Sequence, residues 1–304
     1  MDMEDAAVTR ESLALIALLR RSKRWSELKL RLEEHQPSDL LAGELGGGLF
    51  TEDVVNQAIE EARHEVATWA ARGIAVATPY GGHYPAQLKP VHDYPLMLFS
   101  RGVYDDRDER SVAVVGTRKP SDGALQFIRE VVPALVEKGH VVVSGLARGV
   151  DTAAMQASLD AGGRTVGIIG TGILHSYPAE NRSLQERIAS DHLLLSQFWP
   201  DAPPTKSSFP MRNHVMSAFS SMTLIVEASE HSGTRIQARA ATQHARPLII
   251  TRAVYLQTVW GRELVERGLD VTVVSSAREA VAAVESIARR ATVAEQRRLV
   301  TSGA

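Results

Sequence analysis

Two short β-branched runs, each followed by a glycine turn and a helical stretch, constrain the fold more than any other feature of the chain. The first run, Ser111–Val115, stops at Gly116-Thr117-Arg118. The second, Val141–Val143, stops at the turn Ser144–Asp151. Short apolar runs that end in glycine and then open a helix are typical of βαβ units in a parallel sheet. The turns of such units offer backbone N–H groups and a helix N-terminus to an anion.

The same alternation continues to about residue 290. We expect strands at 112–115, 141–143, 165–169, 193–196, 222–227, 247–251 and 270–274, and helices at 122–137, 151–161, 181–189, 211–219, 234–245, 258–267 and 277–290. This order predicts a doubly wound, mostly parallel α/β sheet with right-handed crossovers. We assign 111–290 to this domain and 291–304 to a charged C-terminal tail that frays or extends the last helix.

Residues 1–72 have apolar residues at helical spacing and no decisive motif, so we expect a small helical domain that packs on the main one. The expected helices are Glu11–Arg21, Trp25–Glu34 and Thr51–Ala71, with the glycine-rich stretch Leu41–Leu49 as a flexible connector. Residues 73–110 form a linking segment with Tyr-Pro turns at 84–85 and 94–95 and a short strand at Leu96–Phe99.

Composition excludes several classes of protein. The 304 residues include no cysteine, which removes disulfide and thiolate chemistry, and no apolar run approaches the roughly 18 residues of a membrane span. Acidic residues near the N-terminus argue against a secretory signal, so we expect a cytoplasmic protein with no membrane partner. The formal net charge of −2 argues against indiscriminate adhesion to nucleic acid but allows a local basic groove.

Polar residues collect directly after the predicted strands, where open α/β sheets bind their ligands. Four of them are arginines, whose planar guanidinium binds phosphate oxygens in pairs. The candidate phosphate-binding or DNA-binding residues are Gly116, Thr117, Arg118, Ser144, Gly145, Arg148, Gly149, Asn181, Arg182, Phe209, Arg212, Asn213, Ser232 and Gly233.

Several of these features also have a plainer interpretation. Single glycines after strands are common in tight βα turns, and Asp151 is at least as suited to capping a helix or holding Arg148 as to catalysis. Phe209, which we place at the end of a loop, suits the core and a base-stacking platform equally well. Met211 and Met216 are more typical of the core.

Motifs for cofactors and metals are absent. Gly170-Thr171-Gly172 is a fragment of the dinucleotide fingerprint, but His175 stands where the third glycine belongs, and the chain has no P-loop string. His175, His214 and His231 have neither metal-ligand spacing nor a paired acid nearby in sequence, so we expect them on the polar surface. The sequence therefore predicts no cofactor, no metal and no catalytic residue.

Together these stretches resemble the DNA-processing protein A family, also called DprA or Smf. The resemblance covers roughly residues 80–270. The matching strings are Val-Val-Gly-Thr-Arg (114–118), Ser-Gly-Leu-Ala-Arg-Gly-Val-Asp (144–151), Gly-Thr-Gly-Ile-Leu (170–174), Tyr-Pro-Ala-Glu-Asn-Arg-Ser-Leu (177–184), Phe-Pro-Met-Arg-Asn-His (209–214), Val-Glu-Ala (226–228) and Ser-Gly-Thr (232–234).

The resemblance implies an extended Rossmann-like fold that binds single-stranded DNA, usually as a homodimer, and helps to load a RecA-type recombinase during natural transformation, without catalysis. It implies phosphate contacts from Arg118 and Arg212, backbone donors from the turn Ser144–Asp151, and a continuation of the DNA track at Asn181-Arg182. The chain departs from the family at Ala179, where a lysine is usual, at His214, where an arginine is usual, and at Thr251-Arg252, where Pro-Gly is usual.

Two alternatives come from other classes of protein. Related folds cleave nucleotide N-glycosidic bonds or bind signalling nucleotides, and Asp151 and Glu227 are the carboxylates that such a site would need. A purely structural partner protein is the third possibility, which the density of arginines after the strands disfavours.

Overall fold

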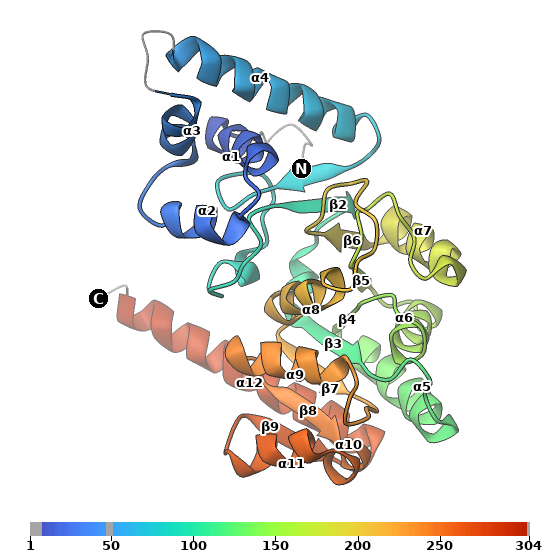
Figure 1. Ribbon diagram of the computed structural model, residues 1–304. Helices are drawn as coiled ribbons and strands as arrows, with labels where there is room; N and C mark the ends of the chain where they lie inside the picture. Colours follow the sequence, from blue (N-terminus) through green and yellow to red (C-terminus); the bar gives the residue numbers. More distant parts are fainter. Residues whose placement is uncertain (1–7, 47–50, 303–304) are drawn as a thin grey trace.

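The centre of the protein is a nine-stranded sheet, seen in a computed structural model that describes residues 8–46 and 51–302 (Figure 1). The strand order is β1-β2-β6-β5-β4-β3-β7-β8-β9. The strands are β1 Ala75–Ala77, β2 Leu98–Gly102, β3 Ser111–Val115, β4 Val141–Ser144, β5 Thr165–Ile168, β6 Leu193–Ser196, β7 Met222–Ile225, β8 Leu248–Thr251 and β9 Val271–Val274. Strands β3 to β9 are parallel, and β1 and β2 add an antiparallel edge beside β6. The expected mostly parallel, Rossmann-like sheet is confirmed.

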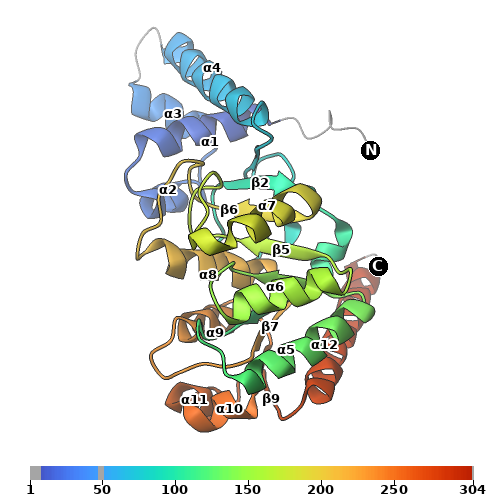
Figure 2. The same cartoon turned by 90° about the vertical axis from the view of Figure 1, so that its right-hand side faces the viewer.

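Helices cover both faces of this sheet. Figure 2 looks onto the face that carries α5, α6, α7 and α12, whereas α8 and α9 lie behind it. The helices are α1 Arg10–Arg21, α2 Trp25–Arg31, α3 Pro37–Leu45, α4 Thr51–Ala70, α5 Asp122–Glu137, α6 Val150–Asp160, α7 Arg182–Asp191, α8 Ser208–Phe219, α9 Thr234–Gln243, α10 Arg252–Gln257, α11 Val259–Glu266 and α12 Ala277–Ser302, with 3₁₀ turns η1 Ala86–Leu88, η2 Asp106–Arg110 and η3 Ala179–Asn181.

Strand β3 shows why its sequence is an unbroken apolar run. Val112 and Val114 belong to the apolar cluster under α5 and α12, whereas Ala113 and Val115 belong to the cluster under α8 and α9. Successive side chains of a strand point to opposite faces. A strand that is buried on both faces therefore needs an apolar residue at every position.

Strand β3 is also the point where the order of the sheet reverses. Strands β4, β5 and β6 follow it on one side, and β7 begins the other half on its opposite side. The connections after β3 and β7 lead away from each other, which leaves a crevice at their carboxyl ends. A ligand site is expected at this position of any sheet with this topology.

The N-terminal helices share a core with the sheet. Leu18 of α1, Trp69 of α4 and Leu194 of β6 belong to one apolar cluster. Trp199, in the loop after β6, lies 6.0 Å from Trp69 between ring centroids and contacts the guanidinium of Arg20 at 3.7 Å from its own centroid. The helices therefore pack on the sheet edge as expected, whereas domain boundaries at 72 and 110 stay a prediction.

Some element boundaries differ from the expected ones. Residues 41–45 belong to helix α3 and not to a connector, because Pro37 starts that helix and Leu41 is buried, while residues 47–50 of the connector lie outside the described residues. The strand expected at Leu96–Phe99 lies at Leu98–Gly102, and β1 was not expected. Residues 291–302 extend α12, which was one of two expectations for the tail.

None of the helices within residues 8–46 and 51–302 combines the length and the apolar character that crossing a bilayer requires.

Candidate nucleic-acid interface

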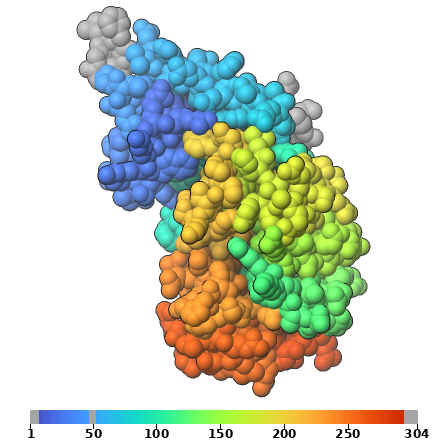
Figure 3. All heavy atoms as spheres, turned by 45° about the vertical axis from the view of Figure 1, so that its right-hand side comes forward, coloured from blue at the N-terminus to red at the C-terminus, as the bar shows by residue number. Residues whose placement is uncertain are grey.

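A cavity of about 430 Å³ opens at the carboxyl ends of β3 and β7, where the sheet reverses direction. Its walls come from the turn after β3, the first turns of α8, the loop after β7 and the start of α9. Figure 3 shows a hollow in this region, where green and orange segments of the chain meet. The cavity brings together eight of the candidate residues: Gly116, Thr117, Arg118, Phe209, Arg212, Asn213, Ser232 and Gly233.

The turn after β3 is fixed by backbone contacts and presents two exposed cations, Arg118 and Lys119. The amide of Thr117 donates to the carbonyl of Glu227 at 2.8 Å, and the carbonyl of Thr117 accepts from the amide of Val150 at 3.1 Å. A side chain at Gly116 would meet Val150 Cγ2 at 2.6 Å, so only glycine fits there. Arg118 is exposed on this rigid turn and forms no ion pair with any described residue.

The turn after β4 is organised by the buried carboxylate of Asp151. Its Oδ2 accepts from the amides of Gly145 at 3.2 Å and Ala147 at 3.3 Å. Burial raises the pKa of Asp151, while the nearby Arg212 and these amides act in the opposite direction. Asp151 thus shapes the turn, which agrees with its plainer interpretation.

Arg212 of α8 lies against this turn as a buried cation. Its guanidinium covers Gly145 so closely that a Cβ there would fall 1.1 Å from Nη1. Nη1 donates to the carbonyl of Ile168 at 3.2 Å and lies 3.8 Å from Oδ2 of Asp151. Burial lowers the pKa of Arg212, opposed by Asp151. A guanidinium remains charged despite such burial, so Arg212 is a desolvated cation at the cavity wall.

The cavity also contains buried polar atoms without partners. Seven buried side-chain nitrogen or oxygen atoms have no hydrogen-bond partner within the described part of the chain. Three of them, Arg212 Nε, Ser232 Oγ and Gln237 Oε1, belong to residues that line this cavity. Buried polar groups are normally satisfied, so this concentration indicates a site that pairs with something polar.

Arg148 differs from Arg118 although it follows the neighbouring strand. Its Nη2 donates to Oε2 of Glu180 at 2.7 Å, and its Nε donates to Oε1 of the same carboxylate. Hydrogen bonds from Arg148 lower the pKa of Glu180. With Gly149 and Asn181, this exposed pair lines a second cavity of about 480 Å³. The charge of Arg148 is therefore already matched.

The other candidate residues of this region are not at the first cavity. Ser144 is buried and donates from Oγ to the carbonyl of Val114 at 2.7 Å. Asn181 is buried, and its Nδ2 donates to the carbonyl of Leu146 and to Thr152 Oγ1, both at 2.8 Å. Arg182 is exposed at the start of α7 and lines neither of the two cavities.

Phe209 is both a packed residue and a partly exposed ring, the two roles that its sequence left open. It lies in the first turn of α8 and not in a loop, and it is half-buried. Its ring centroid lies 5.3 Å from that of the exposed Tyr177 and 5.9 Å from the guanidinium carbon of Arg118. A cation and two partly exposed rings therefore stand side by side at the rim.

Two expectations for single residues were wrong, and one residue of the cavity was missed. Met211 is 46% exposed, whereas Met216 is buried as expected. His214 is half-buried and bonds through Nδ1 to Asp93, which precedes it by 121 residues and is invisible to local sequence patterns. Gln237 was not singled out, because a polar residue within a helix carries no signal of the cavity above it.

The carboxylate of Glu227 has a structural partner. Its Oε2 accepts from the backbone amide of Ser121 at 2.8 Å, at the start of α5. Both carboxylates that a hydrolytic site would need are thus bonded to backbone amides.

A Rossmann-like sheet with a cationic cavity at the reversal of its strand order defines a class of anion-binding α/β proteins. Within that class, the sequence pattern of the family "DNA recombination-mediator protein A" matches residues 75–287. The chain belongs to this family, and the resemblance seen in its motifs is confirmed.

Relatives and solved structures agree with this assignment. The chain is 37% identical to the DNA processing protein DprA of Bacillus subtilis over 182 residues, which are 60% of this chain and 61% of that protein. It is 39% identical to DprA of Streptococcus pneumoniae over 163 residues, 54% of this chain and 57% of that protein. The chain therefore spans less than two thirds of the length of these relatives.

The fold is similar to two experimental structures of relatives. The X-ray structure of DprA from Streptococcus pneumoniae matches with a TM-score of 0.66 and 26% identity, covering 90% of this chain and 97% of that one. A structure of DNA processing protein A from Helicobacter pylori, described for its single-stranded DNA binding mode, matches with a TM-score of 0.61 and 27% identity, covering 70% of this chain and 96% of that one.

Proposed function

We propose that the protein binds single-stranded DNA at the cavity between β3 and β7 and acts as a DNA-processing protein in recombination. One observation carries the proposal: Arg118, which is exposed and has no acidic partner among the described residues, lines the same cavity as the desolvated cation Arg212. Family membership supports it, as does the relative from Helicobacter pylori that is described for binding single-stranded DNA.

In this proposal the two arginines bind phosphate and the rim binds a base. Arg212 offers a fixed, buried guanidinium and Arg118 an exposed one to a backbone phosphate. Phe209 offers a ring face that accepts any base, so sequence preference is weak. Because the phosphate contacts dominate, affinity falls steeply as salt concentration rises.

We further infer that the protein is not an enzyme. Asp151 and Glu227 are each bonded to backbone amides, which leaves neither in the position of a free general base. The alternative of a nucleotide sensor draws on a different observation: polar atoms of Ser232 and Gln237, which have no hydrogen-bond partner among the described residues, line a cavity sized for a small ligand.

The partners proposed from family membership are a RecA-type recombinase and a second copy of this chain, in the cytoplasm. Sedimentation of the full chain over a range of concentrations tests the homodimer. Pull-down of a purified RecA-type recombinase by the DNA-bound protein tests the other partner.

Fluorescence anisotropy with labelled oligo-dT separates DNA binding from nucleotide sensing. DNA binding predicts affinity that grows with oligomer length and falls with salt, with little competition from mononucleotides. Tight binding of a mononucleotide that is indifferent to oligomer length would favour the sensor instead.

The variant Arg118→Ala should cost about 1–3 kcal/mol of binding free energy, because it removes a charge-assisted contact. The matched control is Arg72→Ala, which removes another exposed cation from the segment before β1 and should bind like the parent. Equal losses in the two variants would mean that only net charge matters.

A further inference from the structure

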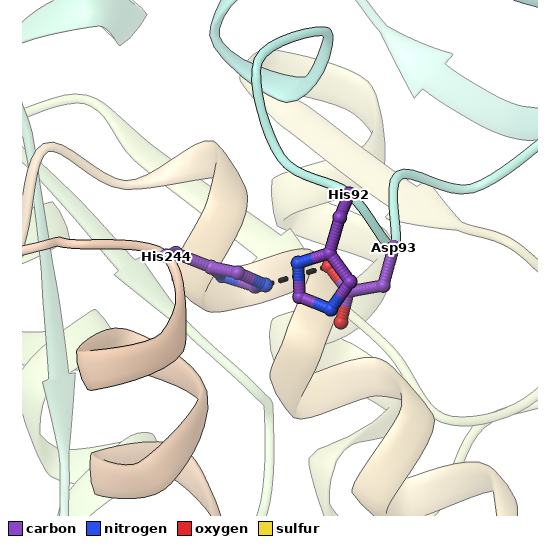
Figure 4. A group of neighbouring side chains, drawn as sticks. All are labelled: His92, Asp93 and His244. Carbon is purple, nitrogen blue, oxygen red and sulfur yellow. Dashed lines mark hydrogen bonds and ion pairs between the residues drawn. The ribbon is translucent and has the colours of Figure 1, made fainter.

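A second cluster of polar side chains lies away from the cavity, where the loop before β2 meets the end of α9. This loop carries His92 and Asp93, and His244 lies at the C-terminal end of α9 (Figure 4). One ligand atom from each residue lies within 4.8 Å of those of the other two. Oδ1 of Asp93 lies 2.6 Å from Nε2 of His244.

A third imidazole reaches the same carboxylate from α8. Nδ1 of His214 is hydrogen-bonded to Oδ2 of Asp93, the oxygen that His244 does not use. The rings of His92 and His214 lie 6.0 Å and 5.9 Å from the ring of His244 between centroids. Three imidazoles and one carboxylate therefore converge from three separate segments of the chain.

The environment of His244 suits a metal ligand. Its ring is fully buried, and its Nδ1 lies 3.0 Å from the hydroxyl oxygen of Ser217. A hydroxyl that accepts from Nδ1 fixes the ring and leaves Nε2 to point at Asp93 and His92. Such an outer hydrogen bond is the usual way in which proteins orient a metal-binding histidine.

The distances are compatible with a small ion. Zinc binds imidazole nitrogen and carboxylate oxygen at about 2.0–2.2 Å, which sets tetrahedral edges of roughly 3.3–3.5 Å between ligand atoms. The distance between Oδ1 of Asp93 and Nε2 of His244 is now 2.6 Å. It would have to increase by less than about 1 Å when the ion replaces the proton of their hydrogen bond. His92 is exposed, and its ligand atom lies within 4.8 Å of the other two, so rotation of its side chain can bring it into coordination distance.

We propose that His92, Asp93 and His244 bind one divalent transition-metal ion of the zinc type, with His214, which is bonded to Asp93, as a further nitrogen beside the site. The donor set, imidazoles with a single carboxylate, favours zinc and its neighbours over magnesium or calcium, which prefer oxygen ligands. The ion joins the loop before β2 to the end of α9, and His214 connects the ligand Asp93 to α8, which also carries Arg212.

His92 separates this proposal from a plain hydrogen-bonded cluster. Asp93, His214 and His244 already bond to one another without an ion. The side chain of His92 makes no hydrogen bond to any described residue, so the hydrogen-bonded cluster does not depend on it. The metal site does, because His92 supplies one of its three ligand atoms. Removal of His92 should therefore affect metal binding and leave the fold intact.

The test is calorimetric titration of the metal-stripped full chain with zinc chloride in the absence of DNA. The parent should bind one equivalent, and His92→Ala should bind at least about tenfold more weakly. The matched control His64→Ala removes an exposed imidazole from α4 and should bind like the parent. Cobalt(II) as a second probe should give the visible absorption of a nitrogen-ligated tetrahedral ion, lost in His92→Ala.

Thermal unfolding guards against a folding artefact. Without metal, His92→Ala and the parent should have the same melting temperature. Zinc should raise the melting temperature of the parent but not that of the variant. The proposal is overturned if the parent binds no zinc, if His92→Ala binds as tightly as the parent, or if His64→Ala loses as much.

Discussion

The turns after β3 and β4 have similar sequences, but only one of them presents an arginine that is free of an acidic partner among the described residues. Each follows a buried strand, contains glycine and carries an exposed arginine at the same edge of the sheet. Arg118 has no acidic partner among the described residues, whereas Arg148 is paired with both oxygens of Glu180. An arginine after a strand is thus available to a ligand only if no acid arrives from elsewhere in the chain.

Arg212 links the two turns. It lies on Gly145 in one of them and lines the cavity bordered by the other. The carboxylate that it faces, Asp151, is used by the backbone of the turn, so the pairing is long at 3.8 Å and incomplete. The cavity consequently keeps a net cationic wall, whereas the surface near Arg148 does not.

The largest effect should come from Arg212→Leu, which removes the link between the turns. It leaves the buried Asp151 without its cation, so unfolding free energy should fall by about 3 kcal/mol in a denaturant titration, and oligo-dT binding should be lost. Burial raises the pKa of Asp151 in the folded state, so folded protein binds this proton at pH values above the unfolded pKa of about 4. A protonated Asp151 needs no cation. The difference in unfolding free energy between the parent and Arg212→Leu should therefore become smaller as the pH is lowered towards that value. A difference that does not change with pH would contradict this account.

Gly145→Ala should have the next largest effect, because the new Cβ occupies the place of the Arg212 guanidinium. We expect a loss of about 1–3 kcal/mol in unfolding free energy together with weaker DNA binding. Gly123→Ala is the matched control, since its Cβ would meet only Ser121 Oγ at 3.8 Å in the first turn of α5. Unchanged DNA affinity in Gly145→Ala would argue against a role for Arg212.

The smallest effect should come from Glu180→Gln, which makes the second turn resemble the first. Removing the acid frees Arg148, so affinity for oligo-dT should rise slightly and its salt dependence should steepen. Stability should hardly change, because exposed ion pairs contribute little. Arg148→Ala should bind DNA like the parent, and a strong loss in that variant would show that Glu180 does not neutralise it.

The strands and the edge that holds the site could be predicted because each β-branched run ends at a glycine. The same pattern predicts close turns at Gly116 and Gly145, where a Cβ would meet neighbouring atoms at 2.6 Å and 1.1 Å. The pairing of Arg148 was not foreseen, since nothing in sequence directs Glu180, 32 residues further on, towards it. The same holds for Asp93, which meets His214 and His244 across 121 and 151 residues. Local patterns report backbone conformation, whereas the state of a charge depends on contacts made by the whole fold.

The stacking of Trp199 against the N-terminal helices has a practical consequence. The chain has four tryptophans, and Trp199 contacts two of the others, Trp25 and Trp69, at the junction of these helices with the loop that leads from β6 to α8. Their intrinsic fluorescence should therefore report whether the N-terminal helices α1 to α4 are packed against the sheet. A shortened version that begins after α4 would keep the contact of Trp199 with Phe99 but would expose to water the side of the indole that Trp25 and Trp69 cover, in the loop that leads to α8 and Arg212.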